Sequence, residues 1–195
     1  SIRRQRQMCI RDRDNRVASQ EEIKNAIDRA TKTLTAKPEA GRVTKTATVE
    51  WLDGLRCVAS EGGFSVTCDM PAAMGGDGGE PGPGHLSRSA LGVCQTISLA
   101  IAFARHSVAF SGLRVRVEVD MDAGGGLGIE GAAKGYAATR CIVELESDAD
   151  PKLIDKAMGD AWNNSQIGNV FSQPVPLSCE FHLNSGRAAA ELHRG

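Results

Sequence analysis

One cysteine is the residue of this chain best placed to do chemistry. Cys94 lies near the centre of an apolar segment, residues 83–106, whose sequence is PGHLSRSALGVCQTISLAIAFARH. A cysteine thiolate is a nucleophile and can be oxidised to a sulfenic acid. A cysteine among apolar residues can equally be a small hydrophobe that fills a core. The sequence leaves both interpretations of Cys94 open.

The other cysteines and the histidines predict no metal site. The chain has six cysteines, none in a CxxC pair, and four dispersed histidines. Their spacing suits neither a zinc site nor a dense disulfide framework. The glycine-rich stretch 71–84 contains no phosphate-binding pattern, so no cofactor is expected. We expect this stretch to be a flexible lead into the segment that carries Cys94. Scattered cysteines are typical of a reducing cytoplasm, which is the expected location. The remaining cysteines are Cys9, Cys57, Cys68, Cys141 and Cys179.

The composition argues against nucleic acid and membranes as partners. The net charge is -1 and aromatic residues make up 4% of the chain, so neither a basic surface nor a base-stacking platform is expected. Residues 83–106 come nearest to a membrane span. Their polar side chains, and the charges at Arg88 and Arg105, favour a buried helix of a soluble protein instead.

The segment that carries Cys94 is predicted to form one long helix at the centre of the fold. No proline interrupts it after Pro83, and its apolar residues fall on every side of the helix. A helix of this kind is wrapped by the rest of the protein rather than laid on its surface. The helix dipole would stabilise a thiolate within the first turn of the helix. Cys94 lies beyond that turn.

The surrounding sequence predicts elements in the order α-β-β-β-loop-α-β-β-α-β. Alternating β-branched and polar residues predict the strands, and the pair Ser19 and Glu22 has the spacing of a capping box. Because strands and helices are segregated, the predicted fold class is α+β with a mostly antiparallel sheet around the long central helix. The predicted helices cover 19–37, 83–106 and 151–164, and the predicted strands 43–51, 55–59, 64–69, 113–121, 136–147 and 175–183.

One domain is expected, with additions at both ends. Residues 1–16 contain six arginines and few apolar residues, so we expect them to be disordered, and they have the composition of a cloning or read-through remnant. A helix is expected within 17–40 and the main domain within 41–184. Residues 185–195 are expected to form a frayed tail.

Four segments of the main domain carry a resemblance to a known family. They are PGHLSRSALGVC (83–94), GLRVRVEVDMDAGGGLGI (112–129), SDADPKLIDKAM (147–158) and SQIGNVFSQPVPL (165–177). In their order and spacing they resemble the OsmC/Ohr family, the osmotically inducible protein C and organic hydroperoxide resistance proteins. The likeness extends over about 42–183. It implies an OsmC-like fold in which two subunits intertwine as a homodimer around their central helices.

The resemblance also implies an activity, of which this chain keeps one element. Active enzymes of the family reduce organic hydroperoxides with an attacking and a resolving cysteine. Cys94 matches the attacking cysteine, whereas the resolving position falls on Ser165, which cannot form a disulfide. The family's glutamate falls on Gly84, and its arginine falls near Leu52, with Arg56 a few residues away. Reduction through Cys94 alone, with a small thiol as reductant, is what remains.

A thiol without these supports is expected to be weakly ionised. At a pKa of about 8.5 only a few per cent is thiolate at pH 7, and apolar burial lowers that fraction further. Arg88 lies on another face of the helix and Arg105 lies roughly 16 Å along its axis, so neither is expected to activate Cys94. Cys141 or Cys179 would resolve an oxidised Cys94 only with its Cα within about 7 Å of the Cα of Cys94.

The sequence therefore leaves two functions open, and with them whether the protein is an enzyme. The first is reduction of organic hydroperoxides through Cys94. The second is a non-catalytic member of the same fold, a dimer that binds a small hydrophobic ligand or has a structural role, or a redox sensor in which Cys94 is oxidised without turnover.

Overall fold

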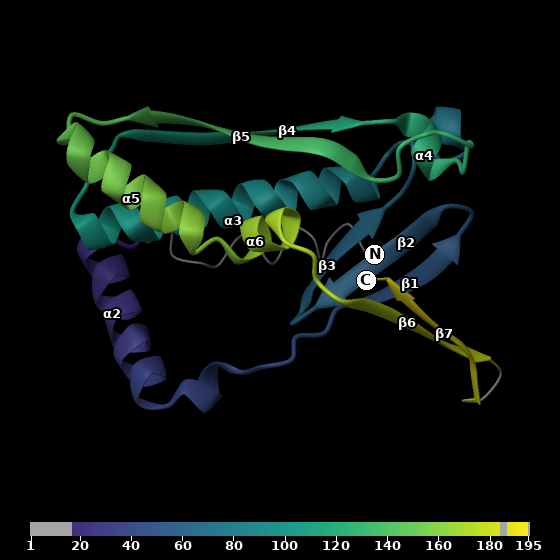
Figure 1. Ribbon diagram of the computed structural model, residues 1–195, viewed down its shortest axis with the longest axis horizontal. Coiled ribbons are helices and arrows are strands. Elements are labelled where there is room, and N and C mark those ends of the chain that lie inside the picture. The colour runs from purple at the N-terminus through teal and green to yellow at the C-terminus, as the bar shows by residue number, and fades with distance from the viewer. Residues whose placement is uncertain (1–16, 184–186, 195) are drawn as a thin grey trace, which may run out of the picture.

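The protein is an α+β fold in which helices pack on antiparallel sheet (Figure 1). The computed structural model describes residues 17–183 and 187–194. The expected disorder of 1–16 lies outside these residues. The helices are α2 (Gln20–Ala36), α3 (Pro83–His106), α4 (Ala123–Gly126), α5 (Pro151–Asn163) and α6 (Gln166–Ser172), with short 3-10 turns η1 (Pro38–Gly41) and η2 (Ala72–Met74).

All strand pairs in the described residues are antiparallel, which confirms the predicted fold class. They form three separate sheets, with the orders β1-β2-β3, β4-β5 and β6-β7. The strands are β1 (Thr48–Asp53), β2 (Arg56–Glu61), β3 (Phe64–Cys68), β4 (Gly112–Met121), β5 (Tyr136–Glu146), β6 (Leu177–Leu183) and β7 (Arg187–Arg194).

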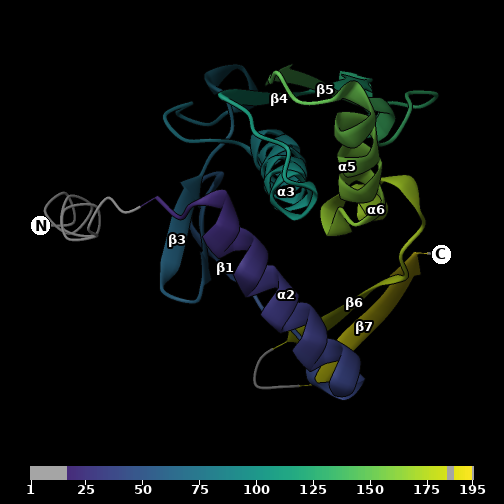
Figure 2. The same cartoon turned by 90° about the vertical axis from the view of Figure 1, so that its left-hand side faces the viewer.

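The core lies between the β4-β5 hairpin and two helices. Figures 1 and 2 show α3 and α5 side by side against one face of this hairpin. Phe103 is completely buried there, and its ring centroid lies 5.4 Å from that of Phe110. The buried residues of this core are Leu99, Ala102, Phe103, Val108, Ala157 and Ala161. The core thus fixes the C-terminal half of α3, directly after the turn that carries Cys94.

The long central helix is confirmed, but a single chain does not wrap it on every side. Helix α3 has proline at its first position and ends at Ser107, in the left-handed region with φ 55°. Val93 and Ile97 remain 58% and 55% exposed. By length and composition alone α3 could cross a membrane, but core helices of soluble proteins pass the same test. This helix packs against β4, α5, α2 and α6.

The loop before α3 is anchored by a buried carboxylate. Asp69 is 2% exposed, and it accepts hydrogen bonds from the backbone N–H groups of Met70 (2.7 Å) and Asp77 (2.8 Å). The sequence predicted a flexible lead into the helix. These bonds instead tie the glycine-rich loop to the end of β3 and fix where α3 begins.

Helix α2 lies outside the core. The capping box is present: Ser19 N–H donates to Glu22 Oε2 (2.9 Å) and Glu22 N–H to Ser19 Oγ (3.2 Å). The helix has no buried residue and points away from α3 in both views (Figures 1 and 2). Its first turn is held to the core by Gln20, whose side-chain amide donates to the Val108 carbonyl at 2.8 Å.

Two strand predictions differ from the structure. The first strand begins at Thr48 rather than Val43. Thr48 pairs with Ser60 near the end of β2, and directly after Glu61 the chain turns into β3 at Gly62. Residues before Thr48 therefore have no strand left to pair with. The tail was predicted to be frayed, but 187–194 form β7, paired with β6. Its alanine-rich sequence carries no strand pattern, so only the pairing reveals it.

Candidate functional site

Cys94 lies half-buried on α3, facing the short helix α6. Its Sγ is 3.5 Å from the hydroxyl oxygen of Ser165, a residue 71 positions further along the chain. Ser165 is completely buried. It caps α6, with its Oγ accepting a hydrogen bond from the Gly168 N–H at 3.2 Å. The first turn of α6 therefore begins directly at the thiol.

Two opposing effects act on the Cys94 thiol. Burial is the largest, and it raises the pKa because a thiolate is poorly solvated in an apolar site. Hydrogen bonds to the sulfur favour the thiolate and together outweigh burial, so the pKa of Cys94 lies below its ordinary value. In order of size, these bonds come from the Ser165 hydroxyl, the Ile167 N–H, the Ser98 hydroxyl and the Gln166 N–H. These hydrogen bonds shift the thiol towards its ionised, nucleophilic form.

The expectation of an unassisted thiol is therefore wrong. Within the part of the chain that the structure describes, no charged side chain is among the causes of the lowered pKa. The groups that lower the pKa are instead polar groups at the start of α6, together with the Ser98 hydroxyl on α3. A sequence signal was present, since serine is a preferred helix N-cap. A helix of seven residues is too short for its apolar periodicity to be detected.

No arginine is among the groups that shift the pKa of Cys94 in the part of the chain that the structure describes. Arg56 forms a two-point ion pair with Asp53 at the β1-β2 turn, with one contact at 2.8 Å. Arg105 lies beside α2, with its Nε 3.9 Å from Asp28. The main effects on the pKa of Cys94 come from neither Arg88 nor Arg105.

The four other described cysteines lie on strands outside α6. Cys179 is exposed on β6, and Cys141 is half-buried on β5, where it lines a cavity next to α3. Cys57 and Cys68 lie directly opposite each other on β2 and β3. Cys9 lies outside the described residues. Within 17–183 and 187–194, no three His, Cys, Asp or Glu side chains form a group that could hold a metal ion.

The fold and the cysteine on its central helix define a class of thiol-bearing α+β proteins, and comparison with known families names the class. A family model described as "OsmC-like protein" matches residues 76–180. The chain therefore belongs to the OsmC-like family, whose members are soluble proteins. This confirms the resemblance found in the sequence.

Solved structures of the family share the fold. An OsmC-like protein from Mycoplasma pneumoniae superposes with a TM-score of 0.57 at 14% identity, covering 67% of this chain and 88% of its own. A putative osmotic stress induced and detoxification response protein from Psychrobacter arcticus gives 0.53 at 16%, covering 66% and 89%. The organic hydroperoxide resistance protein OsmC from Legionella pneumophila gives 0.50 at 15%, covering 66% and 89%. A search of curated proteins found no match.

Proposed function

We propose that the protein reduces organic hydroperoxides through Cys94 as the only attacking thiol. The observation that carries this proposal is the lowered pKa of Cys94, which results from hydrogen bonds that converge on its sulfur from Ser165, α6 and Ser98. A thiolate is the reactive form towards peroxides. Membership of the OsmC-like family, and the name of the Legionella pneumophila protein with the same fold, support hydroperoxides as the substrate class.

The chemistry follows from the residues around the sulfur. The Cys94 thiolate attacks one peroxide oxygen; an S–O bond forms, the O–O bond breaks, and the leaving alkoxide takes up a proton to become the alcohol. Cys94 is left as a sulfenic acid. Since Ser165 cannot supply a second sulfur, an external thiol attacks the sulfenic acid and releases water. A second external thiol then reduces the mixed disulfide and regenerates Cys94.

The test compares wild type with Cys94→Ser for consumption of cumene hydroperoxide in the presence of dithiothreitol. Wild type is expected to consume many equivalents of peroxide per chain, and Cys94→Ser none above the protein-free rate. Cys179→Ser is the matched control, because it removes an exposed thiol outside the site. Equal consumption by wild type and Cys94→Ser would remove the proposal.

The absence of a resolving thiol at Ser165 favours one alternative, a redox sensor. A sensor would form the Cys94 sulfenic acid once and would then stop. Trapping with dimedone distinguishes the two functions. A sensor accumulates one adduct per chain with no further loss of peroxide, whereas an enzyme supplied with dithiothreitol keeps the adduct low while peroxide disappears.

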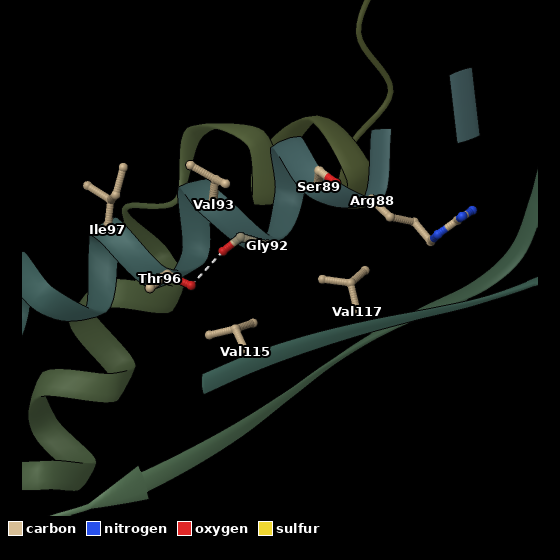
Figure 3. A pocket seen from close by; sticks show the side chains of 8 residues that line it. All are labelled: Arg88, Ser89, Gly92, Val93, Thr96, Ile97, Val115 and Val117. Carbon is tan, nitrogen blue, oxygen red and sulfur yellow. Dashed lines mark hydrogen bonds between the residues drawn. The ribbon is translucent and has the colours of Figure 1, made fainter. Parts of the chain in front are cut away.

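The working form that we propose is a homodimer. Val93 and Ile97 point away from β4 on the uncovered side of α3, beside a groove that Val115 and Val117 line from below (Figure 3). Trp51 is 72% exposed on β1. Such apolar surface is typical of a partner interface. A single chain has a mass of 20.6 kDa; light scattering should give twice that for wild type and the single mass for Ile97→Asp.

A further inference from the structure

Two cysteines that the proposed function does not use lie opposite each other on neighbouring strands. Cys57 on β2 is the register partner of Cys68 on β3, in the antiparallel hairpin formed by these strands (Figure 1). Residues opposed in this way have Cα atoms about 4.5 or 5.5 Å apart, depending on the kind of pair. Disulfides span Cα separations of about 4.4–6.8 Å. A disulfide can therefore join the two residues while both strands keep their positions.

The two thiols also affect each other. Opposed residues of an antiparallel pair place their side chains on the same face of the sheet, and both cysteines are free thiols. Burial is the largest effect that raises the pKa of the Cys68 thiol, and the charge and a side-chain hydrogen bond of Cys57 raise it further. A hydrogen bond of this kind acts only between neighbouring groups, so the two side chains reach each other.

The two cysteines differ in their access to solvent. Cys57 is half-buried, whereas Cys68 is buried and only 4% exposed. An external oxidant can therefore reach the sulfur of Cys57 and not that of Cys68. An accessible thiol next to a second thiol is the arrangement of a redox couple, in which the first thiol meets the oxidant and the second resolves the product.

We propose that Cys57 and Cys68 form a reversible dithiol–disulfide couple that is oxidised by small-molecule disulfides of the glutathione disulfide type. The couple is a second thiol site, and it lies on the β1-β2-β3 sheet rather than on α3. The proposal goes beyond the proposed function, because no step of it involves Cys94.

Two thiol–disulfide exchange steps balance the reaction. The Cys57 thiolate attacks one sulfur of the oxidant; a mixed disulfide forms on Cys57, and the first small thiol leaves as a thiolate and takes up a proton. Cys68 loses its proton to solvent and attacks the Cys57 sulfur; the bond between the two residues forms, and the second small thiol leaves and is protonated. Two protein thiols are oxidised, and one small disulfide is reduced to two thiols.

The burial of Cys68 acts on both directions of the reaction. An incoming reductant can reach only Cys57, so Cys68 is the leaving group, and a thiol with a raised pKa leaves slowly. In the forward direction the same pKa leaves little Cys68 thiolate. Attack within one hairpin compensates, because its effective concentration far exceeds that of any external thiol. The disulfide should therefore persist once it has formed.

The test uses the full chain with Cys94→Ser, so that no oxidation passes through the thiol on α3. The protein is incubated with glutathione disulfide and quenched with acid. Free thiols are then blocked with N-ethylmaleimide in denaturant, and the unreduced peptides are analysed by mass spectrometry. The expected product is a pair of peptides joined through Cys57 and Cys68. Cys179 is exposed and lies opposite Leu192, so it should keep its glutathione and serve as the internal control.

Variants in the same background separate the two steps. Cys68→Ala allows the first step and prevents the second, so glutathione on Cys57 should accumulate at least about tenfold above its level when Cys68 is present. Cys57→Ala should leave Cys68 unmodified, because Cys68 is buried. Cys141→Ala removes another half-buried thiol from a strand. As the matched control, it should still give the joined Cys57 and Cys68 peptides.

Each outcome decides the proposal without reference to peroxide consumption by Cys94. Joined peptides that separate on treatment with dithiothreitol support the couple. If both cysteines are recovered with N-ethylmaleimide while Cys179 carries glutathione, the pair only packs within the sheet and the proposal is refuted. Equal glutathione on Cys57 with and without Cys68 also refutes it, since the sulfurs then do not meet. Peptides joining Cys57 to several other cysteines would come from the unfolded chain, and they would refute it too.

Discussion

The hydrogen bond between Ser165 and Cys94 offers the sharpest test of the site. Ser165 supplies the largest effect that lowers the pKa of the thiol, and Ser165→Gly removes its hydroxyl. Glycine is preferred to alanine here, since it replaces serine at a helix N-cap at a cost of only a few tenths of a kcal/mol. Helix α6 and its N–H donors should then stay in place.

The magnitude follows from the geometry. A hydrogen bond to a charged group contributes about 1.5–3 kcal/mol, and the 3.5 Å separation of a half-buried sulfur places this bond at the lower end. About 1.4 kcal/mol corresponds to a tenfold change. Ser165→Gly should therefore raise the pKa of Cys94 and slow its alkylation by iodoacetamide at pH 7 about tenfold.

The assay follows alkylation of the Cys94 peptide by mass spectrometry between pH 6 and pH 9. Ser172→Ala is the matched control, because it removes an exposed hydroxyl at the far end of α6, and its rate should equal that of wild type. An unchanged rate in Ser165→Gly at pH 7 would refute the assignment of thiolate stabilisation to Ser165.

The same bond gives stability a dependence on pH. The folded-state pKa of Cys94 is lowered from its ordinary value, so the ionised thiol stabilises the fold fully above the unfolded pKa. The contribution is lost as the pH falls through the folded-state pKa. The free energy of unfolding, measured in urea, should therefore differ more between wild type and Ser165→Gly at pH 9 than at pH 6.

Three further predictions concern single residues. Ser165→Cys places a second sulfur beside Cys94, so treatment with cumene hydroperoxide should give a disulfide between the two residues. Both sulfurs should then be alkylated only after reduction. A variant in which both remain open to alkylation would contradict the contact. Phe103→Ala should lower the free energy of unfolding by about 3–5 kcal/mol, since Phe103 is completely buried. A loss below about 1 kcal/mol, measured by urea unfolding, would place Phe103 outside the core. Asp69→Asn should be less stable than wild type at pH 7, because backbone hydrogen bonds from Asp77 and Met70 hold the pKa of Asp69 low. The difference in the free energy of unfolding should shrink as the pH falls below about 3.9. A constant difference across this range would show that the charge of Asp69 does not anchor the loop.

Local sequence patterns were sufficient for most of the elements. The capping pair Ser19 and Glu22 and the uninterrupted run after Pro83 predicted α2 and α3 within about one residue. The helix predicted over 151–164 matches α5 equally closely. These signals depend on neighbours within four residues, so they can be read without the fold. Strand β7 and the late start of β1 depend on pairing partners instead, and a one-dimensional pattern does not contain them.

The sequence by itself determined the family and the long helix that carries Cys94, because each is encoded in residue types at short spacing. What surrounds the thiol was decided only by tertiary structure. Ser165 lies 71 residues from Cys94 in the chain, and only folding brings its hydroxyl oxygen 3.5 Å from the sulfur. The ionisation of a buried group is set by the donors that reach it. For Cys94, those donors come mainly from α6, a helix that the sequence did not reveal.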